Sequence, residues 1–177
     1  MRIFLVGARA SGKTSVGRSL AERLRVSFAD TDDLVSTIAG ALAGDLLRTK
    51  REPALRAAES AVLARLCEVF DGVVATGGGV VLSEKNRDRM RRGGFVVYLR
   101  AGAETLAARI RAEGEGTRPS LTGAPPDEEV SAVLAAREPL YAEIAHLVLD
   151  ATRPVAELVS AIASALPPPP GSAAPPA

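Results

Sequence analysis

Short runs of apolar residues alternate along the chain with longer segments in which apolar residues recur at helical spacing. Runs without polar alternation are typical of strands that are buried on both faces of a parallel sheet. The pattern predicts five strands, at Ile3–Val6, Val26–Ala29, Val73–Thr76, Val96–Leu99 and Leu147–Leu149.

The longer segments between and after these strands have the periodicity of amphipathic helices. Pro53 suits the first turn of one helix, and Pro139 can break another. The predicted helices are Lys13–Leu24, Asp33–Ala39, Pro53–Phe70, Glu84–Arg92, Ala103–Ala112, Asp127–Ala145 and Val155–Ala165.

Strands that alternate with helices predict an α/β fold with three layers, in which helices cover both faces of a five-stranded parallel sheet. The length of 177 residues suits one domain, which we expect over residues 1–166. Residues 167–177 hold six of the twelve prolines and no charge, which predicts a disordered tail. Ligands of such sheets bind beyond the carboxyl ends of the strands.

Composition excludes several classes of function. The 22 basic and 21 acidic residues nearly cancel, and only six aromatic residues occur, so we expect no nucleic-acid partner. The single cysteine, Cys67, excludes an intramolecular disulfide and a cysteine zinc site. Prolines interrupt the apolar C-terminal stretch, and the chain has no secretion signal, so we expect no membrane partner and a cytoplasmic location.

Residues 7–14, with the sequence GARASGKT, match the phosphate-binding motif G-x-x-x-x-G-K-[ST] between a predicted strand and a predicted helix. Backbone N–H groups of such a loop surround a phosphate at the N-terminus of the helix. Lys13 is expected to reach the β- and γ-phosphates of ATP, and Thr14 to ligate Mg²⁺. The expected phosphate-loop contacts are Ala10, Ser11, Gly12, Lys13, Thr14 and Ser15.

Polar and glycine-rich residues also follow the next two strands. Asp30 and Asp32 lie two residues apart, so on an extended segment both would face one side and could serve a metal and a substrate hydroxyl. Alternatively, they cap the following helix and supply its acidic first turn. Gly77, Gly78 and Gly79 allow close backbone approach to a ligand, or form a flexible turn.

Three arginines stand near these motifs in the order Arg56, Arg118 and Arg137. Each alone suits a solvated surface, whereas together they could hold a carboxylate and a transferring phosphoryl group. Arg118 falls in the segment 114–126, whose three glycines and three prolines suit a mobile lid or an ordinary loop.

Taken together, these motifs resemble the shikimate kinase family over residues 1–166. The resemblance implies a P-loop kinase fold with a mobile lid, and transfer of phosphate from MgATP to the 3-hydroxyl of shikimate, a step toward chorismate and the aromatic amino acids. On the nucleotide side it implies Mg²⁺ bound by Thr14 and, through water, by Asp30. It places Arg118 on the phosphates, and Arg111 and Arg153 beside the adenine.

On the acceptor side, the resemblance implies that Asp32 binds the hydroxyls of shikimate. Arg56 and Arg137 would bind its carboxylate, and the backbone of Gly77, Gly78 and Gly79 would contact the substrate. Lys13, Asp32 and Arg118 would be the catalytic residues. We expect a monomer with this small molecule as its partner.

Three positions depart from the family pattern and bear on the shape of the acceptor site: Arg51, Leu55 and Ser36 replace the usual Gly, Phe and Glu. Other functions therefore stay open. The alternatives are a kinase for a related carboxylated polyol such as gluconate, a nucleoside monophosphate kinase, and a P-loop module that binds nucleotide without catalysis.

Overall fold

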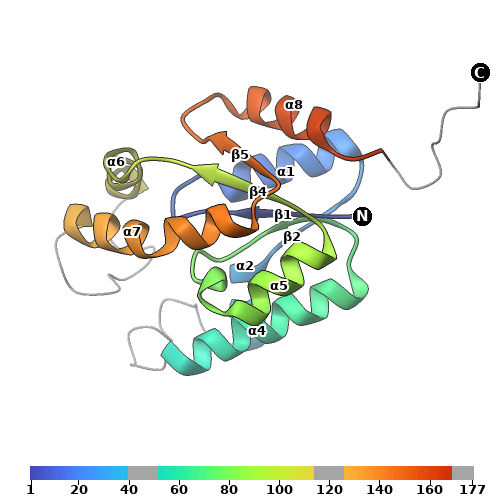
Figure 1. The fold of residues 1–177 in the computed structure, drawn as a ribbon, viewed down its shortest axis with the longest axis horizontal. Helices are drawn as coiled ribbons and strands as arrows, with labels where there is room; N and C mark the ends of the chain where they lie inside the picture. Colours follow the sequence, from blue (N-terminus) through green and yellow to red (C-terminus); the bar gives the residue numbers. More distant parts are fainter. Residues whose placement is uncertain (40–51, 114–125, 169–177) are drawn as a thin grey trace, which may run out of the picture.

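The computed structural model describes residues 1–39, 52–113 and 126–168 (Figure 1). Its strands are β1 (Arg2–Val6), β2 (Ser27–Asp30), β3 (Gly72–Ala75), β4 (Phe95–Arg100) and β5 (Leu147–Asp150). Its helices are α1 (Lys13–Leu24), α2 (Thr31–Ala39), α4 (Glu52–Val69), the 3₁₀ helix η1 (Val80–Leu82), α5 (Glu84–Gly93), α6 (Ala103–Glu113), α7 (Pro126–Ile144) and α8 (Val155–Ala165).

The five strands form one sheet in the order β2-β3-β1-β4-β5, and every pair is parallel. The central strand β1 pairs on one side with β3, where Ile3 lies opposite Val73, and on the other with β4, where Ile3 lies opposite Phe95. The predicted α/β fold with a five-stranded parallel sheet is confirmed. The order of the strands brings the segments that follow β1 and β3 next to each other at one edge of the sheet.

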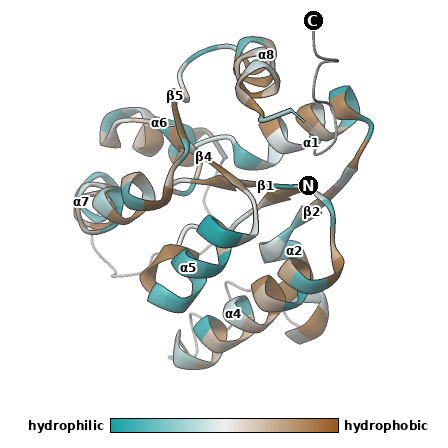
Figure 2. Cartoon of the chain, turned by 45° about the vertical axis from the view of Figure 1, so that its right-hand side comes forward, coloured by the Kyte–Doolittle hydropathy of each residue, from teal (hydrophilic) through white to brown (hydrophobic). Residues whose placement is uncertain are grey.

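Alternate residues of β1 enter two separate hydrophobic cores. Ile3 and Leu5 pack with α1 and α8 on one face of the sheet. Phe4 and Val6 pack with α4, α5 and the C-terminal part of α7 on the other. Figure 1 shows α1 and α8 on one side of the sheet and α4 and α5 on the other. Figure 2 shows the strands as mainly apolar and α5 as largely polar. This confirms the three layers that the sequence predicts.

The predicted bounds of α1 and α8 match the structure, and the others shift by one or two residues. The break that Pro139 could introduce does not occur, since α7 continues through it. Proline removes one N–H from the helix, but buried residues on both sides of it, Leu134 and Tyr141, hold the helix against the two cores. The 3₁₀ turn η1 was not predicted.

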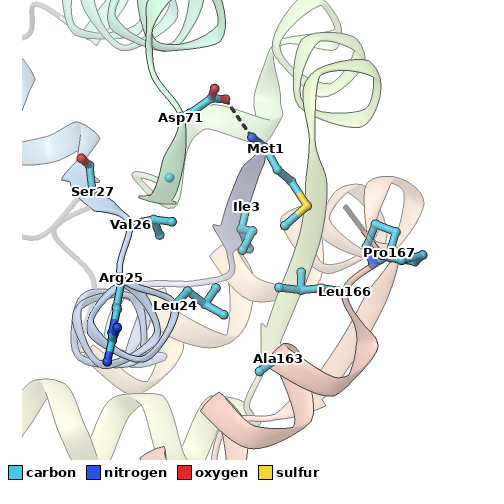
Figure 3. Close-up of a pocket in the computed structure, with 12 residues that line it drawn as sticks. Met1, Ile3, Leu24, Arg25, Val26, Ser27, Asp71, Ala163, Leu166 and Pro167 are labelled. Atoms are coloured by element: carbon cyan, nitrogen blue, oxygen red, sulfur yellow. Dashed lines mark hydrogen bonds and ion pairs between the residues drawn. The ribbon is translucent and has the colours of Figure 1, made fainter. Parts of the chain in front are cut away.

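A pocket lies at the amino ends of the strands, on the edge of the sheet opposite the phosphate-binding motif (Figure 3). Its lining includes Ile3, Leu24 and Val26, and the amino group of Met1 lies 3.1 Å from Asp71 beside it. Residues 167 and 168, the first of the expected tail, also line this pocket, and both are exposed. Residues 169–177 lie outside the described part of the chain. None of the described helices is long and apolar enough to cross a membrane.

We expect a chain that ends at Leu166 to keep the activity and melting temperature of the full chain. The removed residues carry no charge and no aromatic side chain, so they have little to bury. Thermal denaturation and turnover would be measured for this variant and for a control that ends at Pro168. If the melting temperature of the shorter chain alone falls by several degrees, the two prolines at the pocket belong to the folded domain and the prediction is wrong.

Candidate active site

The phosphate-binding loop connects the end of β1 to the start of α1. Gly7 has φ of 148° and Gly12 has φ of 88°, a region that favours glycine. A Cβ on Gly7 would lie only 2.7 Å from the carbonyl oxygen of Leu99. Ala10, with φ of 62°, adopts the left-handed conformation without being glycine. The backbone curvature that the motif requires is therefore present.

Two basic side chains, Lys13 and Arg109, donate hydrogen bonds to oxygen atoms of this loop. Lys13 Nζ donates to the carbonyl oxygen of Ala8 at 2.7 Å and lies 3.4 Å from Ser11 Oγ, so its ammonium group lies across the loop. Arg109 donates to the carbonyl oxygens of Ala10 at 3.2 Å and Ala151 at 2.8 Å. Sequence reasoning missed Arg109, because nothing in a helical segment distinguishes it from a surface arginine.

Asp30 connects the phosphate loop to α2. Its carboxylate accepts a hydrogen bond from the Thr14 hydroxyl at 2.8 Å and another from the Asp32 N–H at 3.0 Å. The expectation that both aspartates lie on one extended segment is wrong, because α2 begins at Thr31 and places Asp32 in its first turn. Asp30 also caps this helix, as the capping interpretation predicts. The same carboxylate keeps Thr14 and Asp32 close to each other.

The glycine triplet, residues 77–79, is the point where the phosphate loop, α2 and α4 meet, and we call it the junction of the site. A Cβ on Gly77 would lie 2.5 Å from Asp32 Oδ1, and a Cβ on Gly79 would collide with the guanidinium of Arg56. A Cβ on Gly78 would face the phosphate loop, 3.5 Å from the backbone nitrogen of Arg9. The absence of side chains at these glycines therefore allows the phosphate loop, Asp32 and Arg56 to approach one another closely.

Arg56 is held by Glu59 one turn later on α4. Its Nη1 donates to Oε1 at 3.0 Å and to Oε2 at 2.8 Å. Burial raises the pKa of the Glu59 carboxyl above its usual range, whereas the hydrogen bond and charge of Arg56 lower it, as the charge of Arg137 also does. The negative charge of Asp32 acts in the same direction as burial. The charges of Asp32, Arg56 and Arg137 thus all act on one buried carboxyl group.

Three arginines were expected to contact the nucleotide, and the structure describes two of them. Arg111 forms an ion pair with Asp127, and Arg153 donates to Glu157 at 3.0 Å. Both pairs are exposed, so their place beside an adenine stays a prediction. Arg118 and the expected lid lie outside the described residues.

Two of the three departures from the family pattern lie in described parts of the site. Leu55 is buried in the core beneath α4, so this substitution changes packing rather than a polar contact. Ser36 donates to the carbonyl oxygen of Asp32 at 2.8 Å, within α2. Leu55 replaces one apolar side chain by another, whereas Ser36 lacks the carboxylate of the usual Glu. Arg51 lies outside the described residues.

The residues around Thr14 suit a magnesium ion that takes most of its ligands from phosphates and water. Across residues 1–39, 52–113 and 126–168, no cluster of three His, Cys, Asp or Glu side chains forms a metal cage. Mg²⁺ is typically bound by one or two carboxylates together with substrate phosphates. The hydroxyl of Thr14 and the carboxylate of Asp30, 2.8 Å apart at the phosphate loop, fit that pattern.

The fold and the phosphate loop define the class of this chain as a P-loop kinase-like α/β protein. The family model described as shikimate kinase matches residues 9–167. The chain is 49% identical over 161 residues to shikimate kinase 2 of Sodalis glossinidius, covering 90% of this chain and 92% of that protein. It is 51% identical over 162 residues to shikimate kinase 2 of Syntrophotalea carbinolica, covering 90% and 94%.

A solved structure is also similar. The shikimate kinase from Acinetobacter baumannii, determined in complex with shikimate, superposes with a TM-score of 0.85 at 34% identity, and the match covers 92% of this chain and 90% of that one. The chain belongs to the shikimate kinase family.

Replacing Arg56 by Met should leave the Glu59 carboxyl without its main partner. We expect a loss of about 2 kcal/mol in the free energy of unfolding at neutral pH, less than the ~3–5 kcal/mol typical of a fully buried pair. The loss is smaller because the side chain of Arg56 is 23% exposed. A raised pKa means that the carboxyl favours the fold when protonated, so the loss should shrink as the pH falls through the raised pKa and should be smallest below the ordinary pKa of glutamic acid.

Denaturant unfolding at several pH values measures this loss, and the double variant Arg56→Met/Glu59→Gln is the matched control. The double variant should regain most of the stability without regaining affinity for a carboxylated acceptor. A single variant as stable as the wild type, or a double variant that regains the affinity, would contradict the roles given to this pair.

Proposed function

We propose that this protein is a shikimate kinase, which transfers the γ-phosphoryl group of ATP to the 3-hydroxyl of shikimate. The observation that carries the proposal is the junction at Gly77–Gly79, where the phosphate loop meets Asp32 and Arg56. A phosphate donor and a carboxylated polyol bound there would lie side by side. Family membership and the similar structure that holds shikimate support this choice of acceptor.

The reaction forms one P–O bond and breaks another. The oxygen of the 3-hydroxyl attacks the γ-phosphorus, the bond to the bridging oxygen of ADP breaks, and the hydroxyl proton is released. Asp32 is the proposed acceptor of that proton, because its carboxylate lies within van der Waals reach of Gly77 and beside the phosphate loop. Lys13 neutralises charge that develops on the transferred group.

For the nucleotide, we assign the N–H groups of residues 10–15 to the phosphates, as their helix-N-terminal position suits. Thr14 and Asp30 are the proposed magnesium residues, the latter through water. When bound, Mg²⁺ would supply positive charge that offsets the negative charge of the phosphates. Thr14 and Asp30 orient each other through their hydrogen bond, which keeps both oxygen atoms at the loop.

For the acceptor, we assign the carboxylate of shikimate to Arg56 and Arg137, and its hydroxyls to Asp32. Glu59 fixes the direction of the Arg56 guanidinium. Bidentate pairing with a planar carboxylate is the recognition for which arginine is suited. Gly77, Gly78 and Gly79 would contact the acceptor through their backbone.

The remaining assignments rest on the family resemblance. We assign Arg118 to the phosphates on a lid that excludes water, and Arg111 and Arg153 to the surroundings of the adenine. We also propose that the enzyme acts as a cytoplasmic monomer on this small molecule, with no nucleic-acid or membrane partner. Size-exclusion chromatography with light scattering would measure the oligomeric state.

A coupled ADP-release assay over shikimate, quinate, gluconate and nucleoside monophosphates tests the proposed function. We expect turnover with shikimate and rates near background with the others. Turnover with gluconate alone would identify the polyol-kinase alternative, and turnover with a nucleotide would identify a nucleoside monophosphate kinase. ATP binding without turnover of any acceptor would identify a non-catalytic module.

Asp32→Asn should lower kcat/KM for shikimate by about 10²-fold or more, because it removes the proton acceptor while keeping the size of the side chain. Binding of ATP should change little, since the Thr14–Asp30 hydrogen bond does not involve this carboxylate. Calorimetric titrations with shikimate and with a non-hydrolysable ATP analogue separate the two effects. If ATP binding is lost while shikimate binding survives, Asp32 serves the metal and the two aspartates have the opposite roles.

Lys13→Ala should abolish turnover and leave the fold intact. We expect the ammonium group to contribute several kcal/mol to the stability of the transition state. In the free protein it donates to the carbonyl oxygen of Ala8 and to Ser11 Oγ, which both belong to its own loop. Steady-state kinetics and thermal denaturation measure the two properties. A near-normal kcat at an unchanged melting temperature would remove the kinase assignment.

A further inference from the structure

Tyr141 connects α7 to the glycine triplet from inside the protein. It follows Arg137 by one helical turn and is 0% exposed. Its hydroxyl donates to the carbonyl oxygen of Gly78 at 2.6 Å. Its ring stacks on that of Tyr98 with 5.2 Å between the centroids. The ring is therefore held on its core side while the hydroxyl reaches the junction of the site.

The Tyr141 hydroxyl stays protonated at neutral pH and remains a donor. Burial raises the pKa of Tyr141 to about 12, while the charge of Arg137 and a side-chain hydrogen bond with it act in the opposite direction. The hydroxyl thus interacts with both Arg137 and Gly78. Both of these residues face the acceptor in the proposed function.

The bond to Gly78 sets the direction of a neighbouring N–H group. The described peptide bonds are trans and planar, so the N–H of Gly79 points opposite to the C=O of Gly78. Because that C=O points toward Tyr141, the N–H of Gly79 points away from it. The triplet turn is closed by a hydrogen bond from the Val80 N–H to the Gly77 carbonyl oxygen at 3.1 Å, which does not involve this peptide.

We propose that Tyr141 is a positioning residue for the acceptor: its hydroxyl fixes the Gly78–Gly79 peptide and the Arg137 guanidinium in the orientation that binds the acceptor carboxylate. The proposal rests on the proposed function, since it concerns the same site. Tyr141 acts through these two groups and touches neither substrate. Its loss affects affinity for the acceptor and leaves the phosphate loop as it is.

Tyr98 on β4 offers a matched control within the same pair of rings. It is 1% exposed and stacks on Tyr141, and burial raises its pKa to about 12 as well. Its hydroxyl, however, has no hydrogen-bond partner among the described residues. Removing either hydroxyl keeps the stacked rings and the core volume. Only one of the two changes cuts a connection to the site.

The test compares Tyr141→Phe and Tyr98→Phe with the wild type by steady-state kinetics in both substrates and by thermal denaturation. For Tyr141→Phe, we expect KM for shikimate to rise about fivefold to tenfold, as the loss of one oriented hydrogen bond predicts. We expect kcat to change less than about twofold and KM for ATP to stay at the wild-type value. Tyr98→Phe should match the wild type in all three.

An unchanged KM for shikimate in Tyr141→Phe overturns the proposal. An equal rise in KM for shikimate and for ATP, together with a lower melting temperature, also overturns it. That pattern indicates a purely structural role. The wild type on the acceptor panel decides the proposed function separately. If the wild type uses gluconate instead, the proposed function fails, and a selective rise in KM for gluconate still supports the positioning role of Tyr141.

Discussion

The close backbone approach at Gly77 and Gly79 is the constraint on which the rest of the site depends. Any side chain at Gly79 would displace the guanidinium of Arg56, and any at Gly77 would collide with Asp32. Glycine therefore brings a carboxylate and a guanidinium into one small space beside the phosphate loop. Asp32 reaches the site from α2 and Arg56 reaches it from α4, and both residues stay helical.

The parallel sheet makes this approach possible. Because β1 lies between β3 and β4, the loop after β1 and the triplet after β3 emerge next to each other. Side chains then fix the register of these loops: Thr76 donates to the carbonyl oxygen of Leu5 at 3.0 Å, and Thr31 accepts from the N–H of Gly77 at 2.8 Å. The nucleotide side and the acceptor side of the proposed site are thus held by the same few strand ends.

Much of this arrangement can be predicted from the sequence, because the phosphate motif and the apolar runs carry local signals. The pattern places α1 and α8 correctly, and the motif places Lys13 at the start of its helix. The sequence left two positions open for Asp32, a strand end and the first turn of a helix, because acidic residues are common at both. The structure shows the second.

Long-range contacts of the site could not be predicted from the sequence. Arg109 reaches the carbonyl oxygen of Ala10, and Tyr141 reaches that of Gly78, across separate elements. Neither residue has a spacing that distinguishes it from a surface or core residue. Such contacts depend on how α6 and α7 pack against the sheet, which local pattern does not encode. The segments 40–51 and 114–125 lie outside the described chain, so the lid expectation stays a prediction.

The position of the phosphate on the product is the most direct test of the proposed site. In that site the arginines hold the acceptor's carboxylate while one defined hydroxyl faces the phosphate loop. Phosphorus–proton correlation spectroscopy on the purified product of a reaction with shikimate and MgATP would locate the ester. We expect a single ester on the 3-hydroxyl. A mixture of esters, an ester elsewhere on the ring, or ADP release without any ester would show that the proposed site is wrong.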